Sequence, residues 1–160
     1  MRNETEANRA VELYSDMVRR ICFMHLKNYA DVEDVFQDVF LKYILHTGEF
    51  ENDAHEKAWF IRVSVNACKD QLKSFFRKKI CSIEDVCTEH FYLQENEHEL
   101  LDRILRLPAK YKTVIYLFYY EGYSAVEIAK VLNKKENTVY SWLSRARVQL
   151  KDDLGGNPIE

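Results

Sequence analysis

Glycine and proline are scarce in this chain of 160 residues, which has four glycines and two prolines. These residues supply most of the turns between β-strands, and no segment shows the alternating pattern of a half-buried strand. Helix-forming residues dominate instead, and 31% of the residues are charged. The composition therefore predicts an all-α protein, whose length allows one ordinary domain or two small ones.

Long apolar runs are also missing. No run of eighteen apolar residues and no secretory leader is present, so we expect no membrane insertion and a cytoplasmic location. Four cysteines are too few for a disulfide scaffold. Cys81, Cys87 and His90 match no standard zinc spacing, which excludes an obvious metal site. No catalytic set or phosphate loop appears, so we expect neither an enzyme nor a cofactor.

The net charge is only −3, which by itself argues against a nucleic-acid-binding protein. The charges are unevenly distributed, however. Residues 1–79 contain thirteen bases and thirteen acids, residues 80–99 contain six acids and no Lys or Arg, and residues 100–160 contain ten bases and seven acids. This distribution predicts two small helical domains, residues 1–79 and 100–154, joined by an acidic linker over residues 80–99.

The segment from Gly122 to Lys151 has the pattern of a helix-turn-helix. Ser124 stands three residues before Glu127, as in a capping box, and Asn133 is suited to a left-handed helix end. A second helix then presents its outer face to a DNA major groove. Its apolar stripe is Val139, Leu143, Ala146 and Leu150. The DNA-binding candidates are Thr138, Tyr140, Ser141, Ser144, Arg145 and Arg147 on the helix and Lys134 and Lys135 in the turn.

Residues 31–44 form a second informative segment. Carboxylates fill the first turn of the expected helix, where they complement the helix dipole. Apolar residues cover more than half of its circumference, which indicates a helix buried on one side and docked on a partner with the other. A core has no need of Asp34, Gln37, Asp38 and Lys42.

A third segment, residues 57–79, carries a basic row beside a buried one. Ile61, Val65, Cys68 and Leu72 recur at helical spacing, and each is followed by a polar or basic residue, about 100° around the helix. Basic residues near aromatic ones suit a surface that binds phosphates and stacks unpaired bases, although a solvated amphipathic helix shows the same pattern. The candidates are Trp59, Phe60, Arg62, Asn66, Lys69 and Lys73.

These three segments resemble the extracytoplasmic-function (group IV) sigma factors of bacterial RNA polymerase. LPAKYKTVIYLFYYEGYSAVEIAKVLNKKENTVYSWLSRARVQL is similar to their region 4, DVEDVFQDVFLKYI to region 2.2, and KAWFIRVSVNACKDQLKSFFRKK to regions 2.3 and 2.4. The resemblance implies that region 2 recognises and opens the −10 element and that region 4 reads the −35 element. It also implies binding to core RNA polymerase, at the beta-prime clamp helices and the beta flap, and a cognate anti-sigma factor. The residues in the places of the region 2.2 motif are Asp31, Glu33, Asp34, Gln37, Asp38 and Phe40.

Several positions depart from the family pattern, mildly at Phe60 and Val63 and more strongly in the helix-turn-helix, where Lys134 and Lys135 replace an apolar and a capping residue. Tyr140 and Trp142 stand where the recognition helix usually carries basic residues, so contact with the groove is expected to be weaker. Two other interpretations fit a helix-turn-helix: a dimeric DNA-binding regulator, or a helical adaptor that uses Tyr140 and Trp142 for protein contact. The acid-and-glutamine face of residues 31–44 favours the sigma factor, because a dimeric regulator does not need it.

Overall fold

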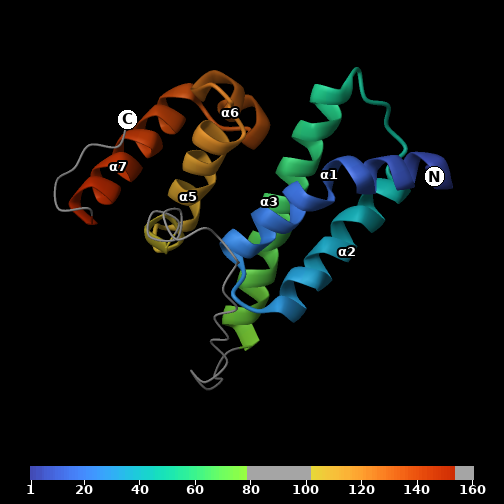
Figure 1. The fold of residues 1–160 in the computed structure, drawn as a ribbon, viewed down its shortest axis with the longest axis horizontal. Helices are drawn as coiled ribbons and strands as arrows, with labels where there is room; N and C mark the ends of the chain where they lie inside the picture. Colours follow the sequence, from blue (N-terminus) through green and yellow to red (C-terminus); the bar gives the residue numbers. More distant parts are fainter. Residues whose placement is uncertain (79–101, 154–160) are drawn as a thin grey trace. The chain divides into compact units, whose positions relative to one another are not determined.

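The computed structural model describes residues 1–78 and 102–153, and in these ranges every regular element is a helix (Figure 1). The prediction of an all-α fold is confirmed. The chain divides into two compact units, Met1–His90 and Phe91–Glu160, each described here by itself. The predicted linker, with Cys81, Cys87 and His90, lies outside the described residues. Among the described helices, none is both long enough and apolar enough to cross a membrane.

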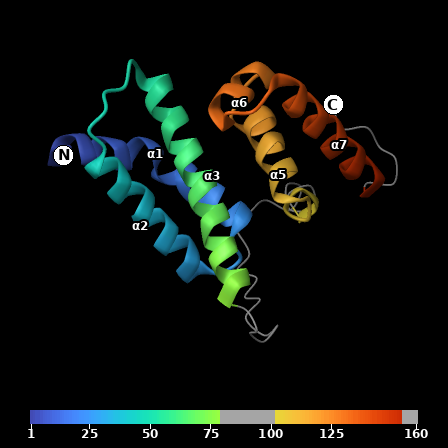
Figure 2. The same ribbon diagram turned by 180° about the vertical axis from the view of Figure 1, so that it is seen from behind.

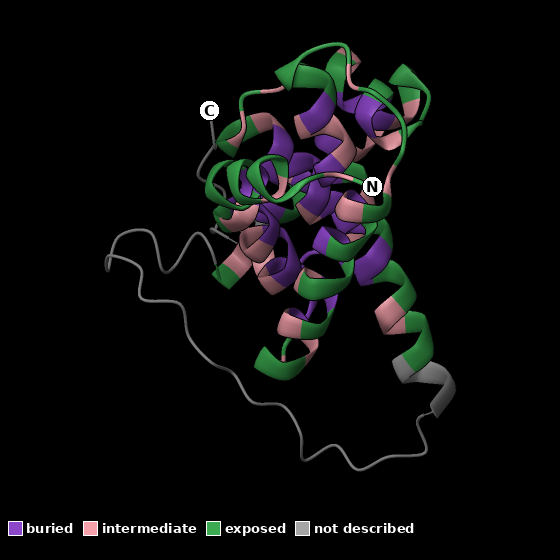
Figure 3. Ribbon diagram, turned by 90° about the vertical axis from the view of Figure 1, so that its right-hand side faces the viewer, coloured by how far each residue is buried: buried purple, intermediate pink, exposed green. Residues whose placement is uncertain are grey.

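Three helices make up the described part of the first unit: α1 (Glu4–His25), α2 (Tyr29–Leu45) and α3 (Asp53–Lys78). Each packs against the other two (Figure 1, Figure 2). The buried sides of the helices face one another (Figure 3), as expected for amphipathic helices. α1 begins with a capping box that was not predicted from the sequence. The side chains of Asn3 and Glu6 accept hydrogen bonds from each other's backbone N–H groups, at 2.9 and 3.0 Å.

A buried carboxylate joins these three helices. The side chain of Glu56 on α3 is 7% exposed. Its Oε1 accepts hydrogen bonds from Arg9 Nη1 and the Tyr14 hydroxyl of α1, and its Oε2 accepts one from the Tyr43 hydroxyl of α2, all at 3.0 Å. The pKa of both tyrosines is raised, first by burial and second by the hydrogen bond to Glu56. Because a buried charge is costly unless it is paired and hydrogen-bonded, these three donors offset the burial of the carboxylate.

The second unit contains α5 (Ala109–Ile115), the π-helix η2 (Tyr116–Tyr120), α6 (Ala125–Leu132) and α7 (Glu136–Asp153), after a helical turn over residues 102–105. η2 continues α5 directly and was not predicted. The N–H of Glu121, the residue after η2, donates to the carbonyl of Tyr116, five residues earlier, which is the bond that defines a π-helix. Gly122 then turns the chain with φ at 76°.

The helix-turn-helix prediction is confirmed by α6 and α7. Ser124 and Glu127 form the expected capping box, and their hydrogen bonds lower the pKa of Glu127 below its usual value. Asn133 takes the left-handed conformation, with φ 55° and ψ 51°, and ends α6. The four residues of the predicted apolar stripe on α7 are all buried: Val139, Leu143, Ala146 and Leu150.

We expect Glu56→Gln to lower the free energy of unfolding of the first unit by about 2 kcal/mol. The glutamine side chain loses the charge-assisted hydrogen bonds, and its NH2 group faces a neighbouring donor where the carboxylate offered an acceptor. The measurement is urea unfolding of the full chain in a Trp142→Phe background, where Trp59 fluorescence reports on this unit alone. The matched control is Glu49→Gln, which neutralises an exposed glutamate. Equal stability of the two variants would contradict the role given to Glu56.

Candidate partner and nucleic-acid interfaces

The outer side of α2 carries three of the six residues predicted to bind a partner. Asp34, Gln37 and Asp38 are exposed and lie on the side of the helix opposite its buried valines. Spacings of three and four residues bring side chains onto one helical stripe. The structure therefore brings these three together as one polar surface.

The other three predicted residues hold α2 in place. Phe40 is buried, and its ring centre lies 5.3 Å from that of Phe60. Glu33 forms an ion pair with Arg19 of α1. Asp31 accepts a hydrogen bond from Gln71 of α3 at 3.2 Å. We therefore assign Phe40 to the core and leave it out of the outer surface, while Asp31 and Glu33 link α2 to its neighbours at the edge of that surface.

Two exposed leucines extend the polar surface along α2. Leu41 is 53% exposed and Leu45 57% exposed. At about 100° per residue, both fall within roughly 20° of Asp34 on the helical projection. Neither leucine was predicted from the sequence, although their spacing from Gln37 and Asp38 was the signal that could have revealed them. The name "α2 outer face" is used below for Asp34, Gln37, Asp38, Leu41 and Leu45.

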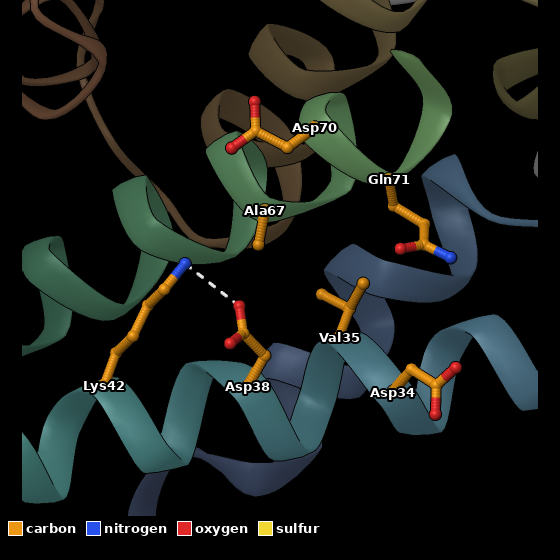
Figure 4. A pocket seen from close by; sticks show the side chains of 7 residues that line it. All are labelled: Asp34, Val35, Asp38, Lys42, Ala67, Asp70 and Gln71. Carbon is orange, nitrogen blue, oxygen red and sulfur yellow. Dashed lines mark ion pairs between the residues drawn. The ribbon is translucent and has the colours of Figure 1, made fainter. Parts of the chain in front are cut away.

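Next to the α2 outer face, a shallow pocket of about 200 Å³ opens between α2 and α3 (Figure 4). Asp34 and Asp38 of α2 and Asp70 of α3 give it three carboxylates. Lys42 Nζ lies 2.9 Å from Asp38 Oδ2 and partly neutralises them. Its remaining lining residues are Val35, Ala67 and Gln71. Among the described residues, no group of side chains suited to a metal ion occurs.

The basic row predicted on α3 is present on the surface. Arg62, Asn66, Lys69 and Lys73 are all exposed, at spacings of four, three and four residues. They are called the α3 basic row below. Trp59 is half-buried at the start of this row, where its ring meets that of Phe50 edge-on at 5.9 Å.

Phe60, in contrast, is not on the surface. It is 0% exposed, stacks on Tyr14 at 4.7 Å and lies 4.9 Å from Tyr43. A ring enclosed in this way cannot stack on a base without opening the core. The prediction that Phe60 contacts DNA is therefore corrected, and the residue is assigned to the core. The buried side of α3 is simply wider than the single stripe seen in the sequence.

On α7, the side opposite the buried stripe is available to a groove. Tyr140 is 54% exposed, Ser144 and Arg145 are exposed, and Thr138 and Ser141 are half-buried. Lys134 and Lys135 are exposed in the turn before α7. Arg147 lies to one side of this surface, where its Nε donates to the Tyr119 hydroxyl at 2.8 Å. The helix thus offers hydroxyl groups, an aromatic ring and one central guanidinium group.

Comparison with known families covers both units. Residues 10–77 match the family described as Sigma-70 region 2, and residues 97–150 match Sigma-70, region 4. RNA polymerase sigma factor SigV of Bacillus subtilis is 33% identical over 147 residues, which cover 84% of this chain and 86% of SigV. The chain belongs to the sigma-70 family of RNA polymerase sigma factors. As a sigma factor it acts in promoter-directed transcription initiation and not as an enzyme.

Other relatives specify the group and the fold. ECF RNA polymerase sigma factor SigW of Bacillus subtilis is 27% identical over 161 residues, covering 90% of this chain and 86% of SigW. The solved structure of the sigma factor RpoE from Bartonella quintana, in complex with the anti-sigma factor NepR, superposes with a TM-score of 0.76 at 22% identity. It covers 92% of this chain and 96% of RpoE. CnrH in complex with the cytosolic domain of CnrY gives a TM-score of 0.69 at 22% identity, covering 97% and 91% of the two chains. The sigma factor is therefore of the extracytoplasmic-function type, as its sequence predicted.

We expect Leu41→Ala combined with Leu45→Ala to weaken binding of the sigma factor to core polymerase by about 2 kcal/mol, roughly 30-fold, because a partner that covers the α2 outer face buries both side chains. The measurement is fluorescence anisotropy of labelled full-length protein titrated with core enzyme. Val11→Ala combined with Leu13→Ala is the matched control, since these residues are 41% and 55% exposed on α1. If both double variants bind equally well, the leucines do not belong to the interface.

Proposed function

We propose that this sigma factor binds core RNA polymerase through the α2 outer face. Carboxylates at one end of that face complement a basic partner and speed association, and the leucines at the other end supply apolar contact area. The beta-prime clamp helices are the expected partner, with the beta flap contacting the second unit. The match to sigma-70 region 2 spans all of α2 and supports this assignment.

We further assign capture of the −10 strand to the α3 basic row, together with Trp59. Cationic side chains bind phosphates, and an aromatic ring that is partly open to solvent can stack on an unpaired base. The row runs for three turns along one exposed side of α3, which is the single observation that supports this part of the function best. Phe60 takes no direct part, since it lies in the core beneath the row.

Recognition of the −35 element is assigned to α7, in the manner of a helix-turn-helix in a major groove. Arg145 is the charged residue at the centre of the outer side, and arginine is the commonest partner of a guanine edge. Tyr140, Ser144 and the two lysines of the turn flank it. We retain residues 1–79 and 100–154 as the two functional domains and residues 80–99 as their acidic linker.

Regulation by an anti-sigma factor in the cytoplasm completes the proposal. The sigma factor RpoE was solved in complex with the anti-sigma factor NepR, and its fold is the fold of this chain. An anti-sigma factor that covers the α2 outer face would compete directly with core polymerase. The cytoplasm is the expected compartment because core polymerase transcribes there.

Transcription by core polymerase with and without the sigma factor tests the function, on a promoter selected by the holoenzyme from a random library.

We expect Asn66→Ala to reduce strand opening, measured by permanganate reactivity of the −10 region, while core binding is unchanged. The reason is that Asn66 is exposed on the α3 basic row and does not belong to the α2 outer face. An equal loss of core binding and of opening would point to a misfolded α3, which circular dichroism detects, and unchanged opening would remove Asn66 from the −10 surface.

We expect Arg145→Ala to weaken promoter binding by the holoenzyme by about 1–3 kcal/mol, by different amounts on different −35 sequences, because Arg145 reads a base edge. The measurement is competition between selected promoters that differ only in the −35 element. Arg106→Ala removes another exposed arginine of the second unit, outside α7, and serves as the control. A loss that is the same for every sequence would assign Arg145 to a phosphate instead.

A further inference from the structure

Arg147, which is expected to bind DNA, also contacts η2 with its guanidinium group. Arg147 Nε donates to the hydroxyl of Tyr119 at 2.8 Å, and the guanidinium carbon lies 5.2 Å from the ring centre of Phe118. Two aromatic residues of η2 therefore hold the guanidinium from one side. In the described part of the chain, no carboxylate pairs with Arg147, so its positive charge is not neutralised there.

The geometry of this contact leaves hydrogen-bond donors pointing elsewhere. An arginine side chain has five N–H donors, and the contact with Tyr119 uses only the one on Nε. Among the described residues, none accepts a bond from the terminal amino groups of Arg147. Since the Tyr119 oxygen accepts from Nε, its own O–H proton also remains available to a second acceptor. Tyr119 is 42% exposed, so solvent or a ligand can reach that proton.

The position of Arg147 along α7 places these donors beside the proposed groove-binding surface. Arg147 comes seven residues after Tyr140, which is about two helical turns or roughly 10 Å further along the same side. Residues near the start of a recognition helix contact bases, and the strands' phosphates border the groove on either side. Lys151 is exposed one turn after Arg147 and adds a second positive charge.

We propose that Tyr119 and Arg147 form a phosphate-binding pair, in which Tyr119 orients the guanidinium and both residues donate to one backbone phosphate of the −35 DNA. This inference rests on the proposed role of α7. It adds a residue of η2 that no sequence motif indicated. The π-helix matters here because its wider turn carries Tyr119 and Tyr120 on the exposed side, while Tyr116 and Leu117 stay buried.

The experiment measures binding of the full-length protein to a short fluorescein-labelled duplex of random sequence, by anisotropy at several salt concentrations. A phosphate contact acts on any sequence, so Arg147→Ala is expected to lower the salt slope by roughly one unit. Tyr119→Phe keeps the ring but removes the hydroxyl, and is expected to weaken binding by roughly 2- to 10-fold. Tyr120→Phe, at a residue 63% exposed in the same π-helix, is the control and should change neither quantity.

The double variant decides whether Tyr119 acts through Arg147. If it does, Tyr119→Phe has little further effect in the Arg147→Ala background, and the two losses are not additive. Additive losses, or a Tyr119→Phe variant with normal affinity and salt slope, would overturn the pair. A purely structural role would lower the melting temperature of the second unit without changing the salt slope, which also overturns it.

Arg145→Ala, measured on a selected promoter alongside these variants, distinguishes a failure of the phosphate-binding pair from a failure of the proposed −35 function. If it weakens binding while Tyr119→Phe and Arg147→Ala do not, only the phosphate-binding pair is wrong. If none of the three variants weakens binding, α7 does not contact DNA and the proposed −35 function fails with it.

Discussion

The carboxylate of Glu56 is the interaction on which the first unit most depends. It is the meeting point of Arg9 and Tyr14 from α1, Tyr43 from α2 and its own helix α3. Apolar packing alone allows helices to slide or rotate, because it is not directional. Hydrogen bonds to a buried charge are directional, and they fix how each helix is rotated about its axis. That rotation decides which side of α2 and which side of α3 faces outward.

Both proposed surfaces of the first unit follow from this rotation. With Val32, Val35 and Val39 turned inward, the acids and leucines of α2 are left exposed along one side. With Phe60 and Ile61 turned inward, the basic row of α3 is exposed along another. One surface is acidic and apolar, and the other is basic. Opposite charges on adjoining helices allow one small unit to hold a protein and a nucleic acid at the same time, since each surface repels the other's ligand.

In the second unit, the turn between α6 and α7 constrains how these two helices are oriented. Asn133 in the left-handed conformation ends α6, and the buried Ala129 and Val139 let the two helices pack closely. The outer side of α7 is thereby set, and Tyr140, Ser144 and Arg145 are exposed on it. Lys110 lies 5.7 Å from the Trp142 ring, which places this tryptophan against α5.

The sequence was enough to predict the helical fold, the capping box at Ser124, the turn at Asn133 and the buried stripe of α7, because each depends on residues within one or two helical turns of one another. It also indicated the family, through local motifs. The packing of the helices, which local patterns do not show, makes Phe40 and Phe60 core residues, leaves Leu41 and Leu45 exposed and places Glu56 at the buried junction of three helices. Periodicity shows that a helix has an apolar side, but the width of the buried arc depends on how many neighbours cover it. The contact of Arg147 with Tyr119 joins residues 28 positions apart, and such pairs become visible only when packing brings them together.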